Sequence, residues 1–274
     1  MSNAKVNILP VATFGWLGVN SASQADISEF ETENFILTAP SGDRRSEVIY
    51  IDREGSTDVN IKVEDNASAK AVLVYDVKGQ AYSKVTAQVG EGASFELVEL
   101  FLGGDVANEV VTELVGRKAV FEADIGYKLE NSDRLDINLI ANHHGRKTLS
   151  RINARGVLSG DAQKTFKGTI DFKKGADGAK GSENEEVLLM SDSAVNKTVP
   201  LILCAEENVE GSHGASIGRI DERQVFYMQS RGISPDRIYE LAAQAKLKQV
   251  TTKIEDADTI KRIAKRLNQG DDNE

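Results

Sequence analysis

The chain has 274 residues, of which 40% are hydrophobic and 28% are charged, and this is enough for one large globular domain or for a domain with an appendage. Its formal net charge of −10 argues against binding to nucleic acid or to an anionic membrane, because phosphate groups are bound by clustered Lys and Arg. The sequence contains no run near the roughly 18 apolar residues of a spanning helix and no basic-then-apolar signal peptide. A single cysteine excludes an internal disulfide framework and favours a cytoplasmic location.

Residues 1–47 are predicted to form an N-terminal arm followed by a loop. The apolar segment Leu9–Asn20 contains the only Trp and is too short to be a domain. It either packs on the body of the protein or binds a partner. Residues 21–47 are rich in Ser and acidic residues, which is typical of a loop that crosses the surface.

Residues 48–220 are predicted to be rich in short strands. Val59–Val63 and Ala119–Ile125 alternate between apolar and polar residues, which is the period of a half-buried strand. The other expected strands are 48–51, 71–75, 82–89, 95–101, 110–114, 137–141, 149–154, 165–168, 170–172 and 201–204. Strand starts recur roughly every 10–14 residues with Gly, Asn and Asp turns between them, which favours a sandwich, a barrel or a β-solenoid.

Three small turn segments recur directly before expected strands. They are Glu64–Ala67, Gly90–Ala93 and Ser159–Ala162. A small residue at each corner suits a stack of coils. The residues alone leave the choice between a solenoid and a sandwich open.

Three helices are predicted in the last part of the chain, where the apolar period changes to 3.6 residues. The first begins at Asp221–Glu222 and ends at Arg231–Gly232, and the second begins at Ser234–Pro235, since Ser caps helices and Pro suits the first position. The third begins near Asp256–Asp258. The apolar stripes are Val225, Phe226 and Met228, then Ile238, Leu241, Ala242 and Ala245, then Ile260, Ile263, Ala264 and Leu267. Because each stripe needs a cover, residues 221–274 form either a small helical subdomain or a docking surface for a partner.

Sequence signatures of common enzymes are missing. The chain has no GxxxxGK[ST] phosphate loop, no Gly-x-Ser-x-Gly and no His-Glu-x-x-His. The glycine-rich segment Gly175–Gly181 is acidic at its centre and is expected to be only a loop.

The three histidines and the cysteine are the remaining candidates for metal chemistry. His213 lies between Ser212 and Gly214, so its ring can reach solvent or a metal, and imidazole is a good ligand for iron or zinc. A lone histidine is more often structural. His143 and His144 follow an expected strand and are expected in a surface turn, with at most one of them facing any given site. Cys204 ends an apolar strand and is expected to be a buried small hydrophobe rather than a ligand.

The residues from Leu188 to the last helix resemble the core signature of the SufB/SufD family of iron–sulfur cluster assembly proteins. The matching stretches are Leu188–Ser191, Pro200–Leu203, Asn208–Gly218, Asp221 and Phe226–Ile233. Weaker matches upstream are Leu9–Leu17, His144–Thr148, Gly156–Leu158 and Phe166–Gly168. The resemblance covers essentially the whole chain.

This resemblance implies a mainly β fold, namely a β-helix over residues 48–220 with a small α-helical subdomain over residues 221–274 that docks the ABC-type ATPase SufC. The residues expected in docking are Phe226, Tyr227, Arg231, Gly232, Ile238 and Leu241. Two family members are expected to pair through their β-helices, and a nascent cluster forms at their interface. His213 matches the family histidine associated with that site, so it is the candidate ligand for metal or cluster.

The resemblance also separates two subtypes. SufB proteins tend to carry Glu after this histidine and SufD proteins Gly, so Gly214 indicates a short form of SufD. SufB carries a cluster-associated Cys at a position that falls near Glu185, where this chain has none. The implied function is therefore a non-catalytic scaffold that pairs with a SufB-type subunit. Iron or an iron–sulfur cluster is expected only transiently at the interface, and no cofactor is expected in the isolated chain.

Two alternatives remain open. The first is a SufB-like homodimeric scaffold with SufC, in which His213 of each chain faces its mate. The second is a β-solenoid enzyme that acts on carbohydrate, which needs carboxylates at one recurring coil position, and the sequence shows no such column.

Overall fold

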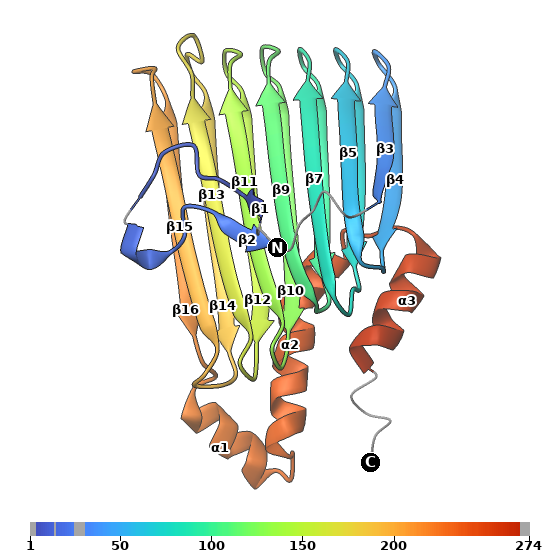
Figure 1. The fold of residues 1–274 in the computed structure, drawn as a ribbon, viewed down its shortest axis with the longest axis vertical. Coiled ribbons are helices and arrows are strands. Elements are labelled where there is room, and N and C mark those ends of the chain that lie inside the picture. The colour runs from blue at the N-terminus through green and yellow to red at the C-terminus, as the bar shows by residue number, and fades with distance from the viewer. Residues whose placement is uncertain (1–3, 14, 25–30, 269–274) are drawn as a thin grey trace.

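The computed structural model describes residues 4–13, 15–24 and 31–268, and these form a parallel β-solenoid with helices on one face. In this part of the chain the polypeptide winds into coils that contribute one strand to each of two facing seven-stranded sheets (Figure 1). The predicted β-helix with C-terminal helices is confirmed. Residues 1–3, 14 and 25–30 of the predicted N-terminal arm lie outside the described residues.

The first sheet contains β3 (Thr32–Ala39), β5 (Gly55–Val63), β7 (Gln80–Val89), β9 (Asp105–Leu114), β11 (Arg134–His143), β13 (Gln163–Phe172) and β15 (Val195–Cys204). The second contains β4 (Arg44–Ile51), β6 (Ser68–Tyr75), β8 (Ser94–Phe101), β10 (Val120–Leu129), β12 (Leu149–Leu158), β14 (Lys180–Leu189) and β16 (Glu210–Gly218). We call them the β15 sheet and the β16 sheet. The helices are η1 (Gly15–Leu17), α1 (Glu222–Ser230), α2 (Pro235–Thr251) and α3 (Ala257–Asn268).

The core lies between the two sheets, because alternate side chains of every strand point inward. In β10, for example, Phe121, Ala123 and Ile125 are fully buried, while Glu122 between them is half-buried on the outer face. Phe95 and Phe121 of successive coils stack with ring centroids 5.5 Å apart. Stacking of like residues in register replaces the interdigitation of a globular core and holds the coils together.

Each predicted corner segment contains one residue in the left-handed region. Asn66, Gly92 and Gly160 have φ values of 57°, 62° and 61°, and the alanine that closes each segment is buried. Gly and Asn adopt this conformation with least strain, so the composition of the corners follows from their geometry. The parallel pairing of every second strand, with this turn repeated between coils, decides for a solenoid the choice that the sequence left open.

The helices begin and end where the sequence predicts. Asp221 caps α1 and Ser234 caps α2, each by accepting a hydrogen bond from a backbone N–H two or three residues later, at 2.8 and 3.3 Å. Gly232, with φ of 85°, ends the first helix. The compact turn between α1 and α2 therefore fixes how the two helices meet.

Helices α2 and α3 pack on the outer face of the β16 sheet (Figure 1). Leu247 and Val250 of α2 and Ile263 of α3 are buried against Val98 and Leu100 of β8. The predicted stripe of α2 holds for Ile238, which is buried, and for Ala242, which packs half-buried against Val157 and Leu188. It is wrong for Leu241 and Ala245, which are exposed, and the buried residues further along the helix are Ala243, Leu247 and Val250. The two helices are thus a layer of the solenoid rather than a separate unit.

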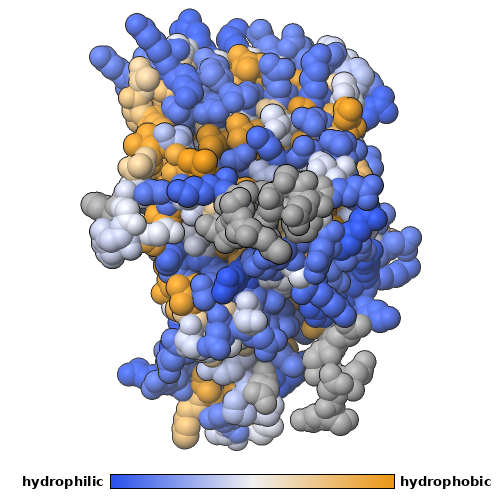
Figure 2. Space-filling view, in the orientation of Figure 1, coloured by the Kyte–Doolittle hydropathy of each residue, from blue (hydrophilic) through white to orange (hydrophobic). Residues whose placement is uncertain are grey.

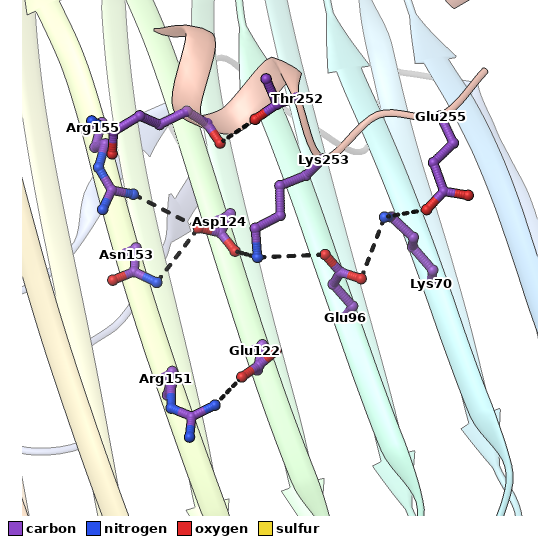
Figure 3. A network of polar contacts seen from close by, with 11 residues as sticks. Lys70, Glu96, Glu122, Asp124, Arg151, Asn153, Arg155, Thr252, Lys253 and Glu255 are labelled. Atoms are coloured by element: carbon purple, nitrogen blue, oxygen red, sulfur yellow. Dashed lines mark hydrogen bonds and ion pairs between the residues drawn. The ribbon is translucent and has the colours of Figure 1, made fainter. Parts of the chain in front are cut away.

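A chain of charges fixes the end of α2 to the solenoid (Figure 3). The ammonium group of Lys253 lies 2.9 Å from Asp124 of β10 and 3.7 Å from Glu96 of β8. Arg155 of β12 approaches Asp124 to 3.7 Å, and Lys70 of β6 approaches Glu96 to 3.3 Å. Four successive strands are bridged to one another and to the helical layer by these contacts.

The N-terminal arm packs on the outer face of the β15 sheet, which agrees with the first of its two predicted roles, packing on the body of the protein. Its strands β1 (Ala4–Val6) and β2 (Ala22–Gln24) pair antiparallel. Leu9 and Val19 are buried. The packing does not exclude partner binding, since other apolar residues of the arm face outward.

The solenoid begins at Thr32, earlier than the predicted boundary at residue 48. The prediction of a loop over residues 21–47 is wrong for β3 and for the start of β4. A terminal coil has a neighbour on one side only, so in β3 only Leu37 and Ala39 are buried and the strand lacks a strong apolar pattern. In the described part of the chain, no helix has the length and hydrophobicity needed to span a bilayer.

Candidate functional site

The solenoid ends in an open coil formed by β15 and β16. Each strand pairs with one neighbour, β13 or β14, and within the described chain its other edge carries unpaired backbone groups. All nine residues of β16 are exposed, although the strand contains Ala215 and Ile217. Edge strands of this length are templates for pairing with another chain. The open coil is therefore the first candidate for an interface.

His213 lies on β16 at the mouth of the solenoid. It is in register with Glu183 of β14, whose column continues through Ile152 and Ala123 into the core. Its imidazole is thus on the inward side of the last coil, and it is exposed because no further coil covers it. A ligand at this position faces whatever completes the solenoid.

A polar cluster lies directly beneath this mouth. Glu185 of β14 accepts hydrogen bonds from the Thr198 hydroxyl at 2.5 Å and the Tyr127 hydroxyl at 3.1 Å. It also pairs with Lys164 of β13, and neither side chain of this pair has any exposed surface. Glu183 reaches toward Gly168, where any larger residue would collide with its carboxyl group. An ion pair and a second acid replace apolar residues in the core at this end.

Burial controls the protonation of the cluster. Desolvation raises the pKa of Glu183 to about 7, and the charge of Glu185 adds to that effect while Lys164 opposes it. Desolvation also lowers the pKa of Lys164, and the attraction of Glu185 only partly offsets this. Beneath His213 the solenoid thus holds an acid that exchanges its proton near neutral pH.

The other candidate ligands lie elsewhere. His143 is buried at the end of β11, where its ring nitrogens lie 2.8 Å from the Thr148 hydroxyl and 2.9 Å from that of Ser150, so the prediction of a surface turn is wrong for it. The prediction holds for His144, whose Nε2 lies 2.6 Å from Glu113 at the surface. Desolvation lowers the pKa of His143 to about 4, which keeps it neutral.

Cys204 is exposed, and the prediction of a buried cysteine is wrong. It continues the inward column of Phe172, but in the last coil that column has no cover. It closes β15 at the turn, whereas His213 is in the column of Glu183. Across the described residues His, Cys, Asp and Glu form no group of three that could hold a metal ion.

The helical layer carries a second surface, on α1 and α2. Phe226 and Tyr227 of α1 are 73% and 59% exposed, and no residue of α1 is buried. The Arg231 guanidinium lies 5.2 Å from the centre of the Tyr227 ring, and Gly232 forms the turn. Between α1 and α2 lies a groove of 630 Å³ lined by residues that include Met228, Ile238 and Leu241.

Of the six residues predicted to dock a partner, Ile238 and Leu241 line this groove, Phe226 and Tyr227 are exposed on α1, and Arg231 and Gly232 lie at the end of α1. Ile238 is only 1% exposed and supports the groove, whereas Leu241 is open to contact at its rim. An exposed aromatic pair beside an apolar groove is typical of a protein-binding surface.

Sequence reasoning missed the polar cluster because it missed strand β14. The inward residues of this strand include Gly181, Glu183 and Glu185, so its apolar pattern is absent. The coil length is the signal that could have found it. Val120 pairs with Leu149, so the preceding coil spans 149 − 120 = 29 residues, and the same spacing places the next strand near residue 178.

The fold defines a class, namely parallel β-solenoids that end in an open coil within the described residues. The family model described as the SufBD core domain of the SUF system for iron–sulfur cluster assembly matches residues 52–246. The chain therefore belongs to the SufBD family, as its sequence predicts.

Three curated relatives agree with this assignment. The chain is 34% identical over 95 residues to the chloroplastic SufBD family protein ABCI8 of Arabidopsis thaliana, covering 35% of this chain and 17% of that protein. It is 27% identical over 183 residues to SufD of Bacillus subtilis, covering 65% and 41%. It is 27% identical over 222 residues to a SufBD family protein of Mycobacterium bovis, covering 76% and 56%. The matched region spans at most 56% of the length of these relatives.

Proposed function

We propose that this chain is a non-catalytic, SufD-type scaffold subunit of an iron–sulfur cluster assembly complex. In this proposal its open coil pairs with a SufB-type subunit, its α1–α2 surface docks a SufC-type ATPase, and a nascent cluster is built where His213 meets the partner. The observation that carries the proposal is the open coil, with two unpaired strand edges and an exposed histidine at its mouth. Family membership and the name of the Bacillus subtilis relative support the assignment.

The pairing step follows from backbone chemistry. Unpaired N–H and C=O groups of β15 and β16 gain partners when a second solenoid continues both sheets. Such pairing also covers the inward face of the last coil, so that His213 becomes enclosed between two solenoids. The cluster is cargo in this proposal. This chain supplies one imidazole, and the partner supplies the thiolates that iron–sulfur clusters require.

The absence of catalysis by this chain is part of the proposal. Some carboxylates on the outer faces of the described strands pair with cations of neighbouring strands, as Glu122 does with Arg151 and Glu109 with Lys84. A carbohydrate-cleaving solenoid needs two carboxylates facing a substrate, which this alternation of charges does not provide. A cytoplasmic location remains a prediction from the single cysteine.

A homodimeric scaffold is the second candidate. It is favoured by one observation. Two copies of the chain present identical open edges of β15 and β16 to each other, so that isologous pairing is possible. In that case His213 of both copies lies at the same junction.

Anaerobic co-expression with a SufB-type subunit and a SufC-type ATPase tests the main proposal. We expect His213→Ala to leave the complex assembled and to lower its iron and sulfide content severalfold. Ser212→Ala is the matched control, because Ser212 is the neighbour on the same strand and points to the opposite face. Undiminished iron and sulfide in the His213 variant would refute the ligand role, and failure of the wild-type chain to co-purify with either partner would refute the scaffold role.

A further inference from the structure

The N-terminal arm extends past the open edge of the β15 sheet. In Figure 1 the segment around η1 lies beyond β15, on the side where the solenoid ends. Trp16 of η1 is 82% exposed, and Ile8 and Val11 of the same arm are 59% and 49% exposed. The segment that extends beyond the edge strand thus carries an exposed aromatic residue. Trp16 is also the only tryptophan of the chain.

The arm is fixed in this position by polar contacts. The Lys197 ammonium group on β15 donates a hydrogen bond to the carbonyl of Leu17 at 3.0 Å. Further from the edge, Lys167 donates to the carbonyl of Asn7 at 3.0 Å, and Asn7 donates to the Asp136 carboxylate at 2.7 Å. The side chain of Lys167 is completely buried beneath the arm. Because the arm is ordered before any partner arrives, binding by Trp16 loses little conformational entropy.

The outer face of β15 carries an apolar stripe next to the same edge. Thr198, Pro200 and Ile202 face the core, so Val199, Leu201 and Leu203 face outward, and these three are half-exposed. Figure 2 shows hydrophobic surface over this part of the sheet, above the arm. The arm itself is anchored nearer the start of β15, at Lys197. The arm that carries Trp16 and the apolar stripe therefore lie over opposite halves of β15.

Two-fold symmetry can bring Trp16 of one copy of the chain onto the apolar stripe of a second copy. An axis normal to the sheets pairs β15 with β15 of the second copy in antiparallel orientation and keeps both arms on the same outer face. The half of one strand that holds Lys197 then lies beside the half of the other that carries Leu201 and Leu203. An axis parallel to the strands would instead bring the arm to the outer face of β16, which has small residues such as Ser212 and Ser216.

We propose that Trp16 is a hook that seats on Val199, Leu201 and Leu203 of a second copy of this chain, and so selects antiparallel β15–β15 pairing. The second copy is the occupant because this chain carries both complementary parts, and because hook and stripe continue the open edge directly. The inference rests on the homodimeric candidate for pairing through the open coil and specifies its geometry. Each dimer then contains two such contacts, one from the Trp16 of each copy.

Sedimentation velocity of the full chain over a concentration series tests the hook. We expect the wild type to dimerise and Trp16→Ala to raise the dissociation constant at least about hundredfold, since two hot-spot contacts worth at least about tenfold each are lost together. Ile36→Ala is the matched control, because Ile36 is 80% exposed on β3 at the other end of the solenoid. It should leave dimerisation unchanged. The fluorescence of the single tryptophan should shift to shorter wavelength as the wild type dimerises.

A mixing experiment separates the hook from a general loss of stability. Leu201→Asp removes the stripe while keeping the hook, so neither it nor Trp16→Ala should form a strong homodimer. A mixture of the two should associate, because one intact hook then meets one intact stripe. No gain on mixing, an unchanged dimer in Trp16→Ala or a monomeric wild type would overturn the hook. If in that event the wild type still co-purifies with a SufB-type subunit and His213→Ala still lowers cluster content, the proposed function stands without it.

Discussion

The buried ion pair beneath the open coil can be tested by replacing Lys164 with Met. Both partners, Lys164 and Glu185, lack any exposed side-chain surface. The substitution leaves the Glu185 carboxylate with only the hydroxyl groups of Tyr127 and Thr198 as donors. Removal of one partner of a buried pair costs about 3–5 kcal/mol, because the other charge remains desolvated and uncompensated. The double variant Lys164→Met with Glu185→Leu removes both charges and should recover most of that loss.

The position of the Lys164–Glu185 pair determines which part of the solenoid loses stability. In a solenoid each coil contacts only its neighbours, so the damage should stay in the last coils. Native-state hydrogen exchange should show lower protection in β13 to β16 and unchanged protection in β5 to β8. The measurement belongs at about pH 6, below the pKa of about 7 of Glu183, so that this neighbouring acid stays protonated in every variant. Equal loss of protection in the first coils, or a double variant as unstable as the single one, would contradict this account.

Two further predictions concern pH and docking. Desolvation raises the pKa of Glu99 from its ordinary value of 4.5 to about 7, so between these values the folded chain keeps a proton that the unfolded chain has lost, and stability should fall by about 3 kcal/mol as pH rises through this range. Glu183, whose pKa is also raised to about 7, should add a similar fall, so Glu99→Gln should remove about half of the total step in urea unfolding measured at several pH values. An unchanged step would assign the pH dependence elsewhere. Phe226→Ala with Tyr227→Ala should abolish co-purification of a SufC-type ATPase without changing thermal stability, because both rings are exposed. Ile260→Ala, on α3 and 44% exposed, is the control, and ATPase retained by the α1 variant would place docking elsewhere.

The sequence predicted the helices better than the strands, for a physical reason. Helix starts and stops are marked by local chemistry, such as the Ser234 cap and the Gly232 turn, which do not depend on the rest of the fold. Strands were found where inward positions are apolar, as in β10. They were missed where the solenoid departs from that rule, in β3 at one open end and in β14 and β16 at the other.

The candidate site shows the same division. His213 could be singled out from its small neighbours and from family resemblance. Its register with Glu183, however, exists only once β14 and β16 are placed side by side. Likewise His143 could not be recognised as buried, since its two hydroxyl partners come from the turn and strand that follow it. The winding of the chain into coils, rather than residue type, creates these environments.

The two surfaces of the proposed function are joined by stiff elements. Helix α2 starts beside the α1 aromatic pair and runs across β12, β10 and β8, where Leu247 and Val250 are buried. Past its end, Lys253 forms ion pairs with Asp124 and Glu96 (Figure 3). Along its length, Lys246 lies 2.5 Å from Glu186 of β14. Strand β14 is hydrogen-bonded to β16 and carries Glu183 on its inner face. A displacement of α1 and α2 by a bound ATPase would therefore act through β14 directly on the strand that holds His213, with no flexible linker between them.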